Sequence, residues 1–345
     1  MPLLGEPPPV QPFPELGRTI GASEFFVKRD DISAPEYGGN KPRKLELLLA
    51  EAKQEGAVGV VTIGGIGTNH GVATAVFAQK LGLTCHLVLF DQPVNDFVRK
   101  NMRLFARYGA IVHYTGSYAK TAFVVAKELI ESRLTSKGKL VLVPPGGTSA
   151  LGTVGYVNAA FEYAEQVEAG QAPIPESVFC AVGSCGTYGG LVAGFKLLGW
   201  PTWVIGVRVV DKMVTNERAV LKAANGALNV MRKHGAEIGG IKITAKDILM
   251  LHEHFGGEYG RATDESLAAV ELAGRHGLQL ETTYTGKTFA GMRAYLAEHP
   301  PAGPVVFWHT FNTVDMSAEL ATVGVDEVHP EFRKFFEDAP AKAAK

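Results

Sequence analysis

Short apolar runs alternate with longer amphipathic stretches along this chain. The apolar runs predict strands at 25–29, 58–63, 84–90, 110–115, 140–144, 177–183, 202–210 and 304–310. The stretches between them predict helices, among them 42–54, 69–81, 94–108, 118–135, 187–198, 264–276 and 288–298. Because the strand runs are continuously apolar, they are typical of parallel strands covered on both faces. We therefore expect an α/β fold of two doubly wound parallel-sheet domains, with ligands bound beyond the carboxyl ends of the strands.

A domain boundary is expected near residue 150, at the end of a block of four strand–helix units. Residues 50–153 are predicted to form a smaller α/β domain, and residues 1–49 together with 154–345 a larger one. Two proline- and glycine-containing segments, 144–152 and 171–177, are predicted to be loops.

Composition excludes several classes of partner. The chain has 345 residues, 20% of them charged, and a formal net charge of −1, so neither nucleic acid nor a membrane surface is an expected partner. No apolar stretch approaches the ~18 residues of a membrane-spanning helix, and the proline-rich start does not resemble a signal peptide. We expect a cytoplasmic protein. The three cysteines, Cys85, Cys180 and Cys185, fit a reducing compartment, and their spacing predicts no metal site.

Two glycine-rich loops follow predicted strands and open predicted helices. In VTIGGIGTNHG (61–71), Thr68, Asn69 and His70 lie at the helix start, which suits a substrate carboxylate; a simple helix cap with a surface histidine is an equal alternative. In AVGSCGTYGGLVAG (181–194), consecutive N–H groups and hydroxyls predict a phosphate site, a tight turn with a capped helix being the alternative. The residues of that predicted cradle are Gly183, Ser184, Cys185, Gly186 and Thr187. A third loop, 143–152, is expected to be a plain turn.

The segment GGNKPRKLE (38–46) places Lys41 directly before a predicted helix and two more cations, Arg43 and Lys44, in its first turn, against the helix dipole. An anion site without its own lysine, together with this separate lysine segment, suggests a phosphate-bearing cofactor joined to a lysine. Pyridoxal 5′-phosphate meets both requirements, with Lys41 as the Schiff-base lysine and Lys44 directed at the phosphate.

Five ordered segments carry a resemblance to a known family. They are GGNKPRKLE (38–46), GGIGTNH (64–70), GSCGTYGGLVAG (183–194), GGEYG (256–260) and TYTGKTFAGM (283–292). The chain resembles the fold-type II pyridoxal-phosphate enzymes, specifically the 1-aminocyclopropane-1-carboxylate deaminase/D-cysteine desulfhydrase group, from about residue 6 to 315. The resemblance implies a tryptophan synthase β-like fold, a homodimer and a small amino-acid substrate, and it makes the larger domain the cofactor-binding one.

The resemblance also implies a role for each matching residue. Lys41 would bind the cofactor and move the substrate α-proton, with Asn40 beside it. Asn69 would hydrogen-bond the ring oxygen and share substrate binding with Thr68 and His70, and Thr68 would also assist proton transfer. Residues 183–187 and Lys44 would hold the phosphate. Tyr259 and Tyr284 would line the active site; without the motif they would be interpreted as ordinary buried tyrosines.

Thr285 lies where the ring nitrogen of the cofactor is expected. Family members that open the cyclopropane ring read Tyr-Glu-Gly-Lys there, whereas this chain reads YTGK (284–287), as the desulfhydrase-like members do. A neutral hydroxyl would leave the ring nitrogen largely unprotonated and weaken its capacity to accept electrons. That favours β-elimination, in which a leaving group removes the charge.

Three departures from the family bear on the substrate. Thr68 replaces a serine, Thr282–Thr283 replaces Asp-Pro, and His309-Thr310-Phe311-Asn312 replaces His-x-Gly-Gly. Phe311 and Asn312 are therefore predicted to narrow the pocket and to contact the substrate.

The expected function is a lyase that removes a β-substituent from a small amino acid, in the manner of D-cysteine desulfhydrase, and releases an α-keto acid and ammonia. Deaminase-like ring opening, β-replacement and racemisation are alternatives on the same scaffold. A cofactor-binding protein with little catalysis is an alternative of another class. A nucleotide-dependent oxidoreductase is disfavoured, because no dinucleotide fingerprint follows a strand.

Overall fold

The computed structural model describes residues 2–135 and 138–337. The chain divides into two compact units, one comprising Met1–Leu47 and Gly147–Val314 (unit 1), the other Leu48–Gly146 and Asp315–Lys345 (unit 2). Each unit contains one sheet, and each sheet is built mainly from parallel strands. The expected α/β fold with two parallel-sheet domains is therefore confirmed, whereas the domain bounds drawn from the sequence stay a prediction.

The sheet of unit 1 has six strands in the order β1-β2-β10-β7-β8-β9. All neighbours are parallel except β1 and β2. The strands are β1 (Val10–Pro12), β2 (Phe25–Lys28), β7 (Ser177–Val182), β8 (Trp203–Arg208), β9 (Leu249–Leu251) and β10 (Val305–Trp308). The four longer strands coincide with predicted ones, and the two three-residue edge strands were not predicted.

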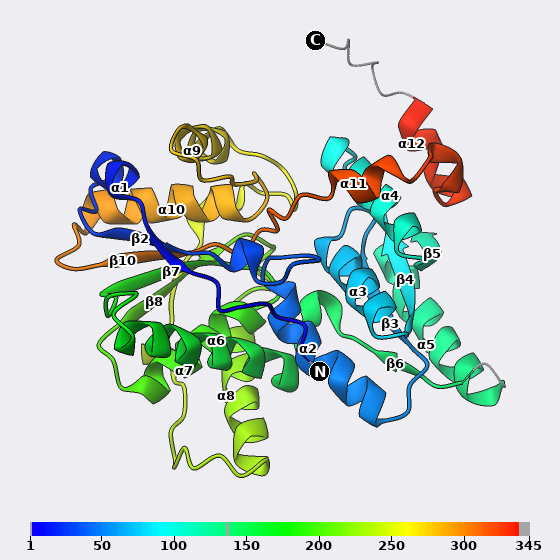
Figure 1. Cartoon of the computed structure of the whole chain (residues 1–345), viewed down its shortest axis with the longest axis horizontal. Coiled ribbons are helices and arrows are strands. Elements are labelled where there is room, and N and C mark those ends of the chain that lie inside the picture. Colours follow the sequence, from blue (N-terminus) through cyan, green and yellow to red (C-terminus); the bar gives the residue numbers. More distant parts are fainter. Residues whose placement is uncertain (1, 136–137, 338–345) are drawn as a thin grey trace. The chain divides into compact units, whose positions relative to one another are not determined.

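Helices cover both faces of this sheet (Figure 1). One face packs on a core that includes Phe25, Phe179 and Phe289, and the other on a core that includes Tyr156 and Trp308. The helices of the first face are α1 (Pro14–Ile20), α9 (Asp264–Arg275) and α10 (Thr285–Glu298), and those of the second are α6 (Ala150–Glu168), α7 (Gly186–Leu198) and α8 (Glu217–Lys233). Helix α6 starts inside the predicted loop 144–152, because Ser149 caps it by accepting a hydrogen bond from the N–H of Gly152.

Helix α2 (Lys41–Gln54) begins in unit 1 with a buried ion-pair network. Arg43 is 2% exposed and donates to both carboxylate oxygens of Asp30, at 2.7 and 2.9 Å, and to both of Glu162, at 2.8 and 2.9 Å. Asp30 also accepts from the Tyr156 hydroxyl and the Trp308 indole N–H, each at 2.8 Å. Protein carboxylates thus balance the Arg43 charge at the helix start.

The sheet of unit 2 has four parallel strands in the order β5-β4-β3-β6. They are β3 (Gly59–Gly65), β4 (Thr84–Phe90), β5 (Ile111–Gly116) and β6 (Leu140–Leu142), all predicted from the sequence. The helices of this unit are α3 (Asn69–Lys80), α4 (Asp96–Arg107), α5 (Tyr118–Leu134), α11 (Ser317–Ala321) and α12 (Lys334–Glu337). Helix α5 packs Val125 on Val61 and Val88 of the sheet.

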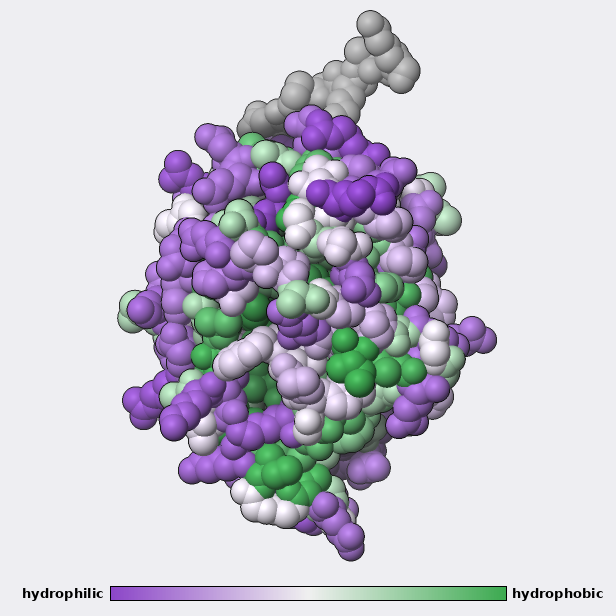
Figure 2. Space-filling model, turned by 90° about the vertical axis from the view of Figure 1, so that its left-hand side faces the viewer, coloured by the Kyte–Doolittle hydropathy of each residue, from purple (hydrophilic) through white to green (hydrophobic). Residues whose placement is uncertain are grey.

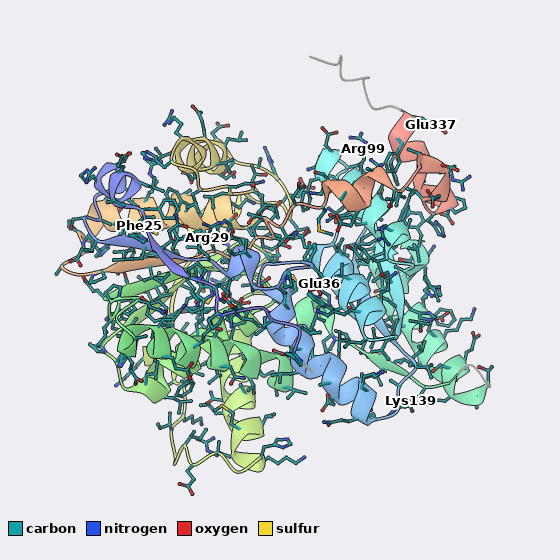
Figure 3. The ribbon with its side chains drawn as sticks, in the orientation of Figure 1. Phe25, Arg29, Glu36, Arg99, Lys139 and Glu337 are labelled. Carbon is teal, nitrogen blue, oxygen red and sulfur yellow. The ribbon has the colours of Figure 1, made fainter. Side chains whose placement is uncertain are left out.

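Side chains of α4 form hydrogen bonds with the last described segment of unit 2. Arg99, labelled in Figure 3, donates from Nε to the carbonyl oxygen of Phe335 at 2.7 Å. Arg103 donates to the carbonyl oxygens of Leu320 and Val323. These bonds satisfy carbonyl groups that follow or end short helices.

No helix of the described residues has the length and apolarity needed to span a bilayer. On the face drawn in Figure 2, hydrophilic side chains are interspersed with small hydrophobic patches.

Candidate active site

Lys41 is the first residue of α2, and the loop before it is held by the segment that follows β10. Gly39 has a φ of 83°, and a Cβ there would lie 2.8 Å from the carbonyl oxygen of Thr310, so this position requires glycine. The N–H of Gly38 donates to Oδ1 of Asn312 at 2.7 Å, and the N–H of Asn40 to the carbonyl oxygen of Thr310 at 3.1 Å. The two segments therefore fix where the lysine side chain begins.

The amine of Lys41 is chemically distinct from an ordinary surface amine. Its Nζ donates to Oδ1 of Asn40 at 2.6 Å, and the side chain is half-buried. Burial lowers the pKa of Lys41 to about 8, although the charge of Glu281 acts in the opposite direction. An appreciable fraction of this amine is neutral near physiological pH, as a nucleophilic lysine requires.

Three other lysines of unit 1 are buried and form hydrogen bonds with protein groups. Lys28 donates to the carbonyl oxygen of Pro8 at 2.6 Å, to Glu162 and to Gln166, and Lys287 donates to the carbonyl oxygen of Phe255 at 2.5 Å. The exposures of Lys28, Lys44 and Lys287 are 0, 1 and 0%. Among these four lysines, Lys41 is the one that is partly exposed.

The predicted phosphate loop lies at the start of α7 and is lined by hydroxyl groups. Ser184 and Thr148 share a hydrogen bond of 2.7 Å between their hydroxyl oxygens, and Nζ of Lys44 lies 3.4 Å from the Thr148 hydroxyl. The Asn40 amide donates to the Thr187 hydroxyl at 2.9 Å, which joins the lysine loop to this cradle. Burial and the neighbouring Lys41 charge both lower the pKa of Lys44.

Backbone geometry keeps this cradle open. A Cβ on Gly186 would lie 2.7 Å from the Thr148 hydroxyl oxygen and 3.2 Å from Nζ of Lys44, so a side chain would fill the space. Cys185, before it, has a φ of 69°, the one positive φ at a non-glycine position among the described residues. A residue held in this conformation turns the chain sharply, and such conformations cluster at ligand sites.

The loop 143–152, expected to be a plain turn, brings the Thr148 hydroxyl into contact with both Ser184 and Lys44. Thr148 therefore lies beside the predicted phosphate loop, a position that the sequence did not reveal. The only sequence signal was a third glycine pair after a strand, because the partners of Thr148 lie 36 and 104 residues away.

Tyr259 and Tyr284 lie together beside this loop. Their hydroxyl groups form a short hydrogen bond, and the Tyr284 ring lies 3.5 Å from the position that a Cβ on Gly183 would take. Burial raises the pKa of both tyrosines. Both phenols are therefore protonated at neutral pH and available as proton donors.

Glu281 organises the start of α10, and the sequence analysis did not identify it. Its carboxylate accepts from the N–H groups of Thr283, Tyr284 and Thr285 at 2.7, 2.8 and 2.7 Å. The Thr285 hydroxyl accepts from the Glu281 N–H at 3.0 Å and lies 3.2 Å from its carboxylate. The carboxylate caps the helix. Its charge also opposes the lowering of the Lys41 pKa by burial.

The predicted carboxylate-binding loop belongs to unit 2. The Thr68 hydroxyl caps α3 by accepting from the N–H of Gly71 at 3.3 Å. His70 is buried, with Nε2 3.0 Å from the Thr62 hydroxyl, so the alternative of a surface histidine is excluded. Asn101 donates to Oδ1 of Asn69 at 3.1 Å and so orients that amide, a function that the sequence did not indicate.

Phe311 and Asn312 belong to unit 1 and pack beside the lysine loop. Oδ1 of Asn312 accepts from the N–H groups of Gly38 and Val314, at 2.7 and 3.2 Å. This contact gives Asn312 a structural function. Its predicted contact with substrate stays a prediction, as does that of Phe311.

Unit 1 thus contains a lysine amine with a lowered pKa, a helix start lined by hydroxyl groups, and two protonated tyrosines. This donor set fits a phosphate-bearing aldehyde cofactor, and the fold places it beyond the ends of parallel strands. The chain matches the family described as "Pyridoxal-phosphate dependent enzyme" over residues 2–310 and belongs to it. Its cofactor is pyridoxal 5′-phosphate.

Solved structures of the same fold include an "ACC deaminase homologue", which is 29% identical, with a TM-score of 0.77 over 93% of this chain and 94% of that one. A pyridoxal 5′-phosphate-dependent aspartate racemase is 16% identical, with a TM-score of 0.62 over 90% and 91%. Threonine deaminase isoform 2 from Solanum lycopersicum is 18% identical, with a TM-score of 0.62 over 93% and 89%. The chain therefore has the fold-type II architecture.

Proposed function

We propose that this enzyme is a lyase that removes a β-substituent, such as a thiol, from a small amino acid and yields an α-keto acid and ammonia. D-cysteine is the reference substrate. The observation that carries the proposal is the half-buried Lys41 amine, with a pKa of about 8, beside the cradle of Thr148 and Ser184.

The groups that would hold the cofactor are already in place. The start of α7, the hydroxyls of Ser184, Thr148 and Thr187, and Lys44 would supply donors to its phosphate, and Lys41 would supply the amine that binds it covalently. When bound, the cofactor accepts the electron pair released at the substrate α-carbon.

The chain's own residues supply the proton transfers. Neutral Lys41 takes the α-proton, and the proton donor for the departing sulfur is the hydroxyl pair of Tyr259 and Tyr284. The Cβ–S bond breaks with its electrons on sulfur, so that the thiol leaves as R–SH. One water molecule enters as the remaining fragment becomes the keto acid and ammonia.

Thr285 favours elimination over ring opening. Its neutral hydroxyl is engaged with Glu281, and it provides no carboxylate of its own to stabilise a protonated cofactor ring. In elimination the leaving group carries away the charge, so the need for such stabilisation is smaller. A second candidate, ring opening of 1-aminocyclopropane-1-carboxylate, is supported by the 29% identity to the ACC deaminase homologue.

The test is a substrate panel with the purified holoenzyme. Keto acid is measured with D-cysteine, L-cysteine, both β-chloroalanines and the cyclopropane substrate, and sulfide with the two cysteines. We expect turnover on at least one β-substituted substrate and a fall in kcat in Tyr284→Phe, which removes the hydroxyl. Tyr118→Phe, at a residue 67% exposed in unit 2, is the matched control. Turnover of the cyclopropane substrate alone would establish the second candidate, and absence of keto acid throughout would refute both.

A further inference from the structure

A second group of chemically competent side chains lies in unit 2 and shares no residue with the candidate active site. It consists of His86 on β4, His113 on β5 and Glu128 on α5. One ligand atom from each side chain lies within 4.8 Å of the other two. Among the residues that the structure describes, no other set of three histidine, cysteine or carboxylate side chains converges in this way.

The sheet register explains why the two histidines meet. Strands β4 and β5 are parallel neighbours in which His113 pairs with Val88, two residues beyond His86, so both imidazoles stand on the same face. Helix α5 covers that face, where Val125 packs on Val88, and it brings Glu128 over the histidines. The position is therefore fixed by three separate elements.

The distances suit one small cation. Nδ1 of His86 lies 3.1 Å from Nε2 of His113 and 3.4 Å from one Glu128 oxygen. The other ring nitrogen of His113, Nδ1, lies 3.5 Å from the second Glu128 oxygen, so the carboxylate faces both rings. Two nitrogen ligands of a tetrahedral zinc ion, each at 2.0–2.1 Å from the metal, are about 3.3 Å apart. One ligand atom from each of the three side chains lies within 4.8 Å of the other two, so a single ion lies within reach of all three after the side chains rotate.

We propose that His86, His113 and Glu128 bind a divalent transition-metal ion of the zinc class, with one coordination position left to water. Two imidazoles and a carboxylate form a donor set typical of zinc, and harder cations such as Mg²⁺ prefer oxygen ligands.

Access favours binding. The side chains of His86, His113 and Glu128 are 15, 22 and 17% exposed, so they are largely enclosed but reachable from solvent. One of the two imidazoles donates to the other, and a change of tautomer in the donor frees both nitrogens without loss of a proton.

No sequence motif marks this site, because its ligands follow no short spacing. They are separated by 27 and 15 residues along the chain and meet only through strand pairing and the covering helix. The cysteines do not compete for the metal in the folded chain, because Cys85, Cys180 and Cys185 are buried.

The test is calorimetric titration of ZnCl₂ into tag-free, chelator-treated holoenzyme at neutral pH. We expect one equivalent to bind, and each of His113→Asn and Glu128→Gln to weaken binding at least about tenfold. His252→Asn is the matched control, because His252 pairs with Glu217 at 2.8 Å but has no second histidine. Co²⁺ should give a visible absorption spectrum of tetrahedral type with the wild-type protein and not with the two ligand variants.

Folding of each variant is checked by circular dichroism, and His86→Asn replaces any variant that fails to fold. Absence of zinc binding by the wild-type protein, or equal affinity in wild type and ligand variants, would overturn the proposal. The cluster would then be a hydrogen-bonded polar group. Since the readout is metal affinity, its outcome is independent of the substrate panel.

Discussion

Replacing Arg43 by methionine tests whether protein carboxylates hold the start of α2, and with it Lys41. Methionine keeps much of the side-chain volume but removes the guanidinium. The substitution leaves Asp30, which is fully buried, and Glu162 without the four hydrogen bonds that Arg43 gives them. Breaking a buried ion pair by removing one partner costs about 3–5 kcal/mol, because the remaining charge stays desolvated.

The assay is urea unfolding followed by tryptophan fluorescence. All three tryptophans, Trp200, Trp203 and Trp308, belong to unit 1, so the signal reports the unit that contains the network. The matched control is Arg275→Met on α9, whose partner Glu271 is 3.1 Å away and where both side chains are more than half exposed. An exposed pair of this kind contributes only about 0.3–0.5 kcal/mol.

The pH dependence adds a second check. Burial alone would raise the pKa of Glu162, but the hydrogen bonds and charges of Arg43 and Lys28 hold it below its ordinary value. A carboxylate with a lowered folded-state pKa stabilises the fold above its unfolded pKa of about 4.3 and loses this effect as the pH falls through the folded value. The deficit of Arg43→Met should therefore be constant between about pH 5 and 8 and shrink in stronger acid.

A double variant identifies the origin of the loss. If the penalty comes from the unpaired Asp30 charge, adding Asp30→Asn to Arg43→Met should cost less than the sum of the single changes. A loss in Arg43→Met no larger than that in Arg275→Met would refute the reasoning. It would mean that the cations at the start of α2 need no protein counter-charge.

Two further predictions concern the cofactor site. Gly186→Ala should weaken cofactor affinity by the equivalent of about 1–3 kcal/mol of overpacking, because its Cβ would lie 2.7 Å from the Thr148 hydroxyl. Gly274→Ala, where a Cβ meets nothing within 4 Å, should leave affinity unchanged, and equal affinities would contradict the cradle. The rate at which cofactor-free protein captures added cofactor should rise with pH around a midpoint of about 8, since the neutral amine reacts. Glu281→Gln should lower that midpoint, because the negative charge of the carboxylate favours protonated Lys41. A wild-type midpoint near 10.4, as for a free lysine, would contradict the argument that burial lowers the Lys41 pKa.

The elements that could be predicted from the sequence are those determined by local pattern. The continuous apolar runs located eight strands, whereas β1 and β9 are three residues each and too short to produce a pattern. The glycine loops and Lys41 were recognisable because glycine is needed close to a ligand or an adjacent backbone, as at Gly39 and Gly186.

What could not be predicted depends on partners distant in sequence. The sequence showed cations at the start of α2 but not what balances them; the anions that pair with Arg43 are Asp30 and Glu162, 13 and 119 residues away. Thr148 likewise contacts Ser184 and Lys44, which are 36 and 104 residues away along the chain. Glu281 is only four residues from Thr285, yet its function appears only once α10 begins and its backbone N–H groups converge.

The central claim is that Lys41, and not another buried lysine, binds the cofactor. The most direct measurement is borohydride reduction of the purified holoenzyme, followed by peptide mapping by mass spectrometry. The account predicts a pyridoxyl group on the peptide containing Lys41, and loss of covalent attachment in Lys41→Ala. A pyridoxyl group on Lys44 or Lys287, or unchanged attachment in Lys41→Ala, would contradict the account.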